Sequence, residues 1–357
     1  MKQGQSLAEF AQQLVAERQA QEDLVADTDR MVVAGQDLHI GGREYRMTEH
    51  ARGQLLQHVK VPKRFADMMR ESSERERVAL DEVVNARLHE NRSKRLVRTY
   101  SGDTGIARAV LSNRYRRLDN LELMESVLPV LHEAPEMRVI SCKVTPDRCY
   151  LKALFPRIEG EVAKGDVVQS GLVISNSEVG GGALKIEPLI YRLVCLNGMI
   201  GQTAMKRNHV GRNIGSDSGM EVLYRDETLQ ADDKAFWLKV QDVVRASLDQ
   251  VQFDGLIEDM RRATGLEIEN PVGTVEVLSK QHQLTETESM GILGKLITGD
   301  SMLHQHGTAN TLYGLVQAIT AYSQDVEDYT RATQFEALGG QVLNMTPNEW
   351  GQFQAQV

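Results

Sequence analysis

Arginine and tyrosine residues alternate over a short stretch in the first third of the chain. Between residues 87 and 117, arginine and lysine far outnumber the acids Glu90 and Asp103, although the chain of 357 residues has a net charge of -9. Guanidinium groups bind phosphates and aromatic rings stack on bases, so this combination is typical of a single-stranded nucleic-acid groove. The candidate residues are Arg95, Arg98, Tyr100, Arg108, Arg114, Tyr115, Arg116, Arg117 and, further along the chain, Lys206, Arg207 and Arg212.

Two less specific interpretations of these residues stay open. The arginines could form a solvated surface that is paired with acids from elsewhere in the fold, and such a surface needs no ligand. Tyr100 and Tyr115 could place their rings in the core of a sheet, where buried tyrosine is common.

Other residues that could do chemistry match no catalytic or metal-binding pattern. His304 and His306 are too few ligands for zinc. The glycines at 180–182 lack the lysine and the following helix of a phosphate loop. Acids without the spacing of a magnesium site are Asp147, Glu178, Glu187, Asp217, Asp226, Asp232 and Asp233. We predict no catalytic residue, metal or cofactor, and the sequence favours a binding protein over an enzyme without excluding an enzyme.

The elements that must position the basic residues indicate an α+β fold, an antiparallel sheet with packed helices followed by an all-helical C-terminal part. Residues 1–93 are predicted to be a helical region with a short hairpin at Gly41 and Gly42. Residues 94–227 are predicted to be the α+β core, in which strands alternating arginine with apolar residues give a basic outer face. Residues 228–357 follow as helices, because the apolar spacing changes there from two residues to about 3.6.

Several finer expectations follow from local patterns. Residues 95–197 are predicted to form one sheet, with a helix over 121–133 packed on it. Helices are expected to begin at Thr48, Thr285 and Asn310. Asn176 and Asn197 are expected at strand ends or turns, where their amides bind backbone groups.

Composition indicates in which cell compartment the protein works and whether it binds a membrane. No stretch approaches the length of about 20 apolar residues that crosses a bilayer, and the N-terminus does not resemble a signal peptide. The three cysteines, Cys142, Cys149 and Cys195, are an odd number that favours buried, reduced thiols. The sequence therefore predicts a cytoplasmic protein with no membrane partner.

Four segments carry a resemblance to a known family. They are RMTEHARGQLLQHVKVPKRF at 46–65, VLSNRYRRLDN at 110–120, LVISNSEVGGGALKIEPLIYRLVCLNGM at 172–199 and GTANTLYGLVQAITAYSQDVEDY at 307–329. Together they resemble an uncharacterised family of phage- and plasmid-like proteins found in phages, prophages and plasmids. The resemblance covers roughly residues 48–329 and implies a cytoplasmic protein of a mobile element. It implies no reaction, because the family has no established one.

Two non-enzymatic functions lead after this comparison. The first is a nucleic-acid-binding protein, with single-stranded DNA favoured, that serves annealing in recombination or replication. The alternative is a non-enzymatic, oligomeric assembly or regulatory protein that binds a protein partner through its C-terminal helices. A homo-oligomer is compatible with both.

Overall fold

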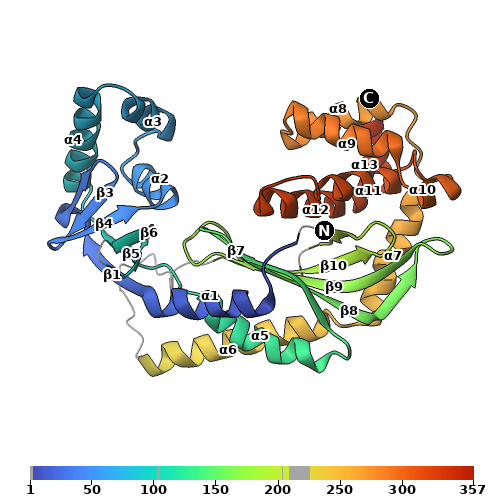
Figure 1. Ribbon diagram of the computed structural model, residues 1–357, viewed down its shortest axis with the longest axis horizontal. Coiled ribbons are helices and arrows are strands. Elements are labelled where there is room, and N and C mark those ends of the chain that lie inside the picture. Colours follow the sequence, from blue (N-terminus) through green and yellow to red (C-terminus); the bar gives the residue numbers. More distant parts are fainter. Residues whose placement is uncertain (1–2, 103–104, 203, 209–225) are drawn as a thin grey trace, which may run out of the picture.

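Two β-sheets, each covered by its own set of helices, build the protein (Figure 1). The computed structural model describes residues 3–102, 105–202, 204–208 and 226–357. The N-terminal sheet has the strand order β1-β5-β6-β4-β3-β2, and the central sheet has the order β11-β10-β9-β8-β7, with β12 also paired to β10. The strand pairs in the described part of the chain are antiparallel except β4 with β6, so the predicted α+β class with antiparallel sheets is confirmed.

The N-terminal sheet and its helices come from the first third of the chain. Its strands are β1 Gln21–Asp27, β2 Met31–Ala34, β3 Asp37–Ile40, β4 Arg43–Met47, β5 Lys94–Tyr100 and β6 Gly105–Ser112. The helices that cover it are α2 Glu49–His58, α3 Lys63–Glu71 and α4 Glu74–Glu90. Their apolar side chains form one core with residues such as Leu55, Val84 and Val97.

The central sheet lies between two layers of helices. Its strands are β7 Arg138–Val144, β8 Cys149–Glu161, β9 Val167–Asn176, β10 Leu184–Arg192, β11 Asn197–Ile200 and β12 Met205–Arg207. Below it in Figure 1 lie α1 Leu7–Ala20, α5 Asn120–Glu133 and α6 Asp226–Ala246. On the other side lie α7 Gln250–Thr264, α8 Pro271–His282, α9 Glu286–Thr298, α10 Ser301–Gln305, α11 Leu312–Tyr322, α12 Tyr329–Leu343 and α13 Pro347–Gln354.

The covering of both faces explains the sequence of β9. Leu172 and Ile174 belong to the core below the sheet, whereas Val173 packs on the other side with Leu189 and Ile200. Because alternate residues of a strand point to opposite faces, a strand buried on both sides needs a continuous apolar run. The described residues after 228 are helical apart from short connections, as predicted.

One architectural prediction is wrong. Residues 95–197 do not form one sheet, because β5 and β6 pair with the N-terminal strands and not with β7. The period-two pattern identified the strands correctly, but pairing depends on which apolar face meets which, and the pattern does not specify that. The predicted boundaries near residues 93 and 227 remain a prediction.

Local signals located several helix ends. Thr48 accepts a hydrogen bond from the amide of Ala51, and Thr285 forms a capping box with Glu288, both as predicted. The predicted start at Asn310 is wrong by one residue, because Thr311 caps α11. No helix in the described part of the chain is long and apolar enough to cross a membrane.

Candidate nucleic-acid interface

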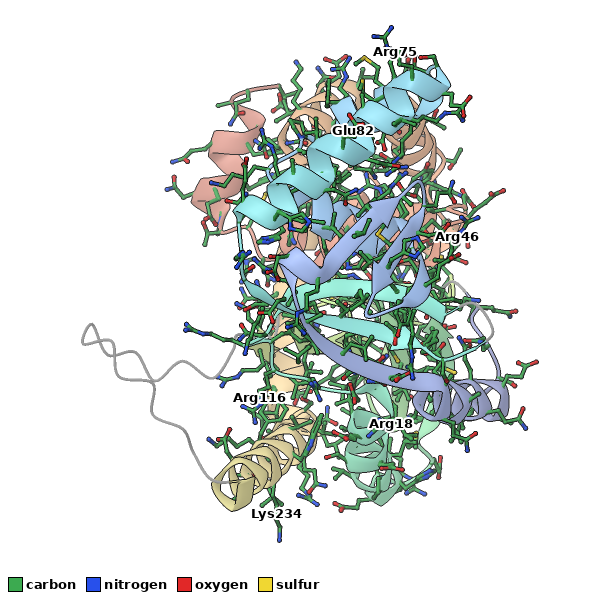
Figure 2. All side chains as sticks on the ribbon, turned by 90° about the vertical axis from the view of Figure 1, so that its left-hand side faces the viewer. Arg18, Arg46, Arg75, Glu82, Arg116 and Lys234 are labelled. Atoms are coloured by element: carbon green, nitrogen blue, oxygen red, sulfur yellow. The ribbon has the colours of Figure 1, made fainter. Side chains whose placement is uncertain are left out.

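Three of the predicted arginines lie inside the protein. Arg98 is completely buried, and Arg108 and Arg116 are each 7% exposed. The predicted basic outer face is therefore wrong for Arg98 on β5 and Arg108 on β6, because both faces of these strands are covered. Arg116 lies after β6. Figure 2 shows Arg116 near α6, below the strands of the N-terminal sheet, where it pairs with Asp232 at 3.1 Å.

Arg98 is the centre of a buried ionic network. It stands opposite Asp23 in the β1–β5 ladder, and its Nε lies 3.1 Å from that carboxylate. Its Nη2 lies 2.6 Å from Asp119, and its Nη1 donates to the carbonyl of Glu178 at 2.9 Å. Burial on its own would lower the pKa of Arg98, but Asp119 and Asp23 raise it above its usual range. The guanidinium thus stays charged and is satisfied by protein groups alone.

Glu178 extends this network from the turn after β9. Its carboxylate accepts from Arg108 at 3.0 Å and from the backbone amide of Asn120, the first residue of α5, at 2.7 Å. An anion at a helix N-terminus is stabilised by the helix dipole and by unpaired amides. The guanidinium of Arg108 also stacks over the ring of Tyr100, with 4.1 Å between Cζ and the ring centroid.

The turn that carries Glu178 joins the two sheets. The hydroxyl of Tyr115 donates to Ser177 O at 3.0 Å, and the amide of Asn176 donates to Leu118 O at 2.8 Å. Gln54 of α2 donates to Val179 O at 2.7 Å. Asn176, the last residue of β9, therefore has the predicted strand-end role towards a backbone group. The ring of Tyr115 packs against the small apolar cluster between the sheets, as the core interpretation expected.

Gly180 is required by the closeness of this junction. Its φ is +78°, and a Cβ there would lie 2.6 Å from a methyl of Leu111 on β6. Any other residue would push the turn away from the N-terminal sheet. The turn at residues 177–182 is thus a tightly fitted joint between the sheets.

The remaining predicted residues are more accessible. Arg114 is exposed, Arg117 pairs with Asp23 at 3.2 Å while its side chain keeps 49% exposure, and Lys206 and Arg207 are exposed on β12. Arg212 lies outside the described residues.

Arg95 lies in a group of cations that sequence analysis identified only in part. Its Nη2 is 2.5 Å from Nδ1 of His58, at the end of α2. Burial, and then the charge of Arg95, lower the pKa of His58, so the imidazole is neutral near pH 7 and accepts this hydrogen bond. Arg87 donates from α4 to Val59 O at 3.1 Å and reaches Lys60 O at 3.4 Å, in the same loop after α2.

We call Lys60, Arg87, Arg95 and Arg114 the cationic patch. Arg95 faces Ser112 in the β5–β6 ladder, and the side chain of Ser112 accepts from the amide of Arg114 at 3.3 Å, so Arg114 continues the group. Sequence analysis missed Lys60 because it lies before the arginine-rich stretch at residues 87–117. Lys60 follows a predicted helix and comes near the arginine-rich stretch only in the folded structure. The sequence therefore gives no signal for its place in the patch.

The fold and this joint define a mixed α+β protein in which buried ion pairs connect two sheets. The chain belongs to a family described as a domain of unknown function (DUF932), whose model matches residues 107–339, more than half of the chain. The match begins inside β6 and ends inside α12. No curated protein and no solved structure matches the chain.

Proposed function

We propose that this protein binds single-stranded nucleic acid, with DNA favoured, through the cationic patch. It would serve a phage or other mobile element in the cytoplasm of the host, in annealing steps of recombination or replication. The observation that carries the proposal is that three cations of the patch have no carboxylate partner among the residues that the structure describes.

The charge balance of the patch supports an anionic ligand. Within the described residues, Lys60, Arg87 and Arg95 form no ion pair, whereas the neighbouring Arg92 pairs with Asp29 at 3.4 Å. Burial lowers the pKa of Arg95, and no acid of the described residues offsets this effect. The chain has a net charge of -9, so an external phosphate is attracted most strongly where cations have no counter-ion.

The rigidity of the patch also supports binding. Arg95 is held by His58, and Arg87 is fixed on the carbonyls of Val59 and Lys60. Groups that are already positioned lose little side-chain entropy when a ligand binds. A strand crossing the patch would therefore meet two guanidinium groups, those of Arg87 and Arg95, that are already positioned.

An exposed aromatic ring lies beside the patch in sequence. Phe65 on α3 is 43% exposed and follows Lys60 by five residues. Bases stack on such rings in proteins that bind single strands without sequence preference. Tyr115 is less suited to this role, because its hydroxyl is bound to Ser177 O and its ring packs inside the joint. Phe65 therefore replaces Tyr115 as the proposed stacking residue.

The experiment is a salt titration of binding to a fluorescent thymidine oligonucleotide. The variant carries alanine at Lys60, Arg87 and Arg114. If each side chain contacts one phosphate, the slope of log K against log salt falls by about 2, at about 0.7 per contact on a single strand. Phe65→Ala costs about 1–3 kcal/mol of binding free energy if the ring stacks on a base.

The matched control has the same change of charge elsewhere on the surface. It carries alanine at Arg157, Arg261 and Arg262, whose side chains are 64%, 48% and 44% exposed. We expect this control to keep the wild-type slope. Equal losses in both triple variants would mean that binding follows net charge and not the patch. Wild-type protein that binds no single strand at low salt would refute the proposal.

The protein-partner alternative has one supporting observation. Met290 and Ile297 are 67% and 59% exposed and lie seven residues apart on one face of α9. An exposed apolar stripe of this kind fits a protein partner. If the titration fails, this function leads, and the replacement of both residues by serine should abolish self-association in sedimentation measurements.

A further inference from the structure

A cavity of about 300 Å³ lies where the C-terminal end of β10 meets the helices α9–α11. Its lining includes Cys195 and Asn197 from the β10–β11 segment, Lys295 and Asp300 from the α9 region, and Gln317 and Ala321 from α11. The cationic patch lies on other elements: its residues come from the loop after α2, from α4, from β5 and from the segment after β6, on the left of Figure 1, whereas α9–α11 lie on the right.

Two buried amides in the lining have hydrogen-bonding capacity to spare. Asn197 and Gln317 are 2% and 5% exposed. Asn197 Nδ2 donates to Gln317 Oε1 at 3.1 Å and to Thr320 Oγ1 at 2.6 Å. Within the described residues, Asn197 Oδ1 has no hydrogen-bond partner, and no bond is formed by Gln317 Nε2. One acceptor and one donor are thus left over on neighbouring side chains.

An unpaired acceptor in this position is costly. A buried polar group without a hydrogen-bond partner loses its hydration and gains nothing in return, so native structures contain few of them and each needs an explanation. Asn197 also differs here from the sequence expectation, because its amide binds side chains and not the backbone. A donor supplied by a bound molecule would satisfy Oδ1 and explain why the asparagine is there.

The charged groups behind the cavity are already paired. Arg192 lies 2.6 Å from Asp166 and also binds Asp300. Asp300 in addition caps α10 by accepting from Met302 N at 2.9 Å and Leu303 N at 3.0 Å. These bonds fix the wall of the cavity and use the oxygens of Asp300.

At the rim, Lys295 and Asp325 neutralise each other at 2.8 Å. The thiol of Cys195 donates to Asp300 at 3.2 Å. No full charge in the lining is left without a partner among the described residues, so a charged ligand would lose hydration without gaining an ion pair.

We propose that this cavity binds a small neutral molecule that presents an amide edge, an N–H donor beside a C=O acceptor. The donor would meet Asn197 Oδ1 and the acceptor would meet Gln317 Nε2. The volume is at the lower end of the range for ligand sites, which limits the molecule to about the size of a nucleobase or a simple aromatic carboxamide. This inference does not depend on the nucleic-acid proposal, because it concerns different residues at a distant place.

Ligand-observed NMR with four probes tests the inference. Uracil and nicotinamide carry the amide edge on a pyrimidine ring and on a side group, while pyrimidine and pyridine are the matched rings without it. We expect at least one amide probe to bind with a dissociation constant below about 1 mM and its matched ring to bind at least tenfold more weakly. Preference for uracil identifies a nucleobase site, and preference for nicotinamide identifies a carboxamide site.

A variant that fills the cavity tests whether the probe binds there. Ala321→Leu should weaken binding at least tenfold, while Ala246→Leu, on exposed α6 surface, should leave it unchanged. If Ala321→Leu does not fold, methyl-labelled alanine in the wild-type protein gives the same answer, because a bound probe must shift the Ala318 and Ala321 signals and not that of Ala246. Equal binding of amide and matched probes, no binding at this level, or no shift at Ala321 would overturn the proposal.

Discussion

Replacing Arg98 by methionine should be among the most damaging single changes in this protein. The substitution keeps much of the side-chain volume and removes the charge. Asp119 is 5% exposed, and among the residues that the structure describes it forms an ion pair only with this guanidinium, at 2.6 Å. Asp23 keeps Arg117 at 3.2 Å, so most of the cost comes from Asp119. Removing one partner of a buried ion pair costs about 3–5 kcal/mol, because a charge is left buried without compensation.

Urea unfolding followed by circular dichroism measures this cost. We expect the midpoint to fall by about 1 M or more at an unchanged slope. The matched control is Arg43→Met, because Arg43 forms its ion pair with Glu22 at 2.8 Å while its side chain is 65% exposed. An exposed pair of this kind contributes about 0–1 kcal/mol, so this variant should remain close to wild type.

A second substitution separates loss of charge compensation from loss of packing. The side chain of Asp119 makes no capping bond to α5, so Asp119→Leu removes the stranded charge without uncapping the helix. The double variant with Arg98→Met should recover at least half of the lost free energy of unfolding. A cost below about 1 kcal/mol for Arg98→Met, or a double variant that is less stable than either single one, would refute this account of the network.

Two further predictions concern titratable groups. Arg331 lowers the pKa of Glu288 to about 2 through hydrogen bonds of 2.7 and 2.8 Å. Because the folded pKa lies below the unfolded one, this stabilisation is complete above about pH 4.5 and is lost as the pH falls towards 2. Glu288→Gln should therefore make the melting temperature depend less on pH over that range. Burial, and then the hydrogen bond to Asp300, raise the pKa of the Cys195 thiol to about 11, so this thiol should react slowly with iodoacetamide at pH 7. Asp300→Asn should increase the reaction rate, after correction for any unfolding of the variant.

Much of the local structure was predictable because its causes are local. Thr48 and Thr285 begin helices through bonds to amides three residues away, and Gly41 and Gly42 form the hairpin because both have positive φ. The pairing of β5 with β1 could not be predicted in this way. It joins residues such as Arg98 and Asp23, which are 75 positions apart.

The candidate site was predictable in residue type but not in exposure. Arginine alternating with apolar residues is normally a half-buried sheet with a charged outer face. Here the turn after β9 covers that face, and Asp23, Asp119 and Glu178 neutralise it from three separate segments. Lys60 joins the patch through the bond of its carbonyl to Arg87 on α4 and through His58, two residues earlier, which binds Arg95. Its place in the patch therefore follows from the tertiary structure alone.

The strand order of the N-terminal sheet also determines when the chain can fold during synthesis. β1 is synthesised early, but its partner β5 is completed only at residue 100. β4 likewise cannot pair with β6 until β6 has been synthesised. Gln5 pairs with Cys142 on β7, so α1 docks later still. The ribosome thus releases the first strand and helix long before their partners exist, and contacts between distant residues form slowly. The N-terminus, although synthesised first, is among the last parts to be secured, and a nascent chain stalled before residue 100 should expose β1 to chaperones.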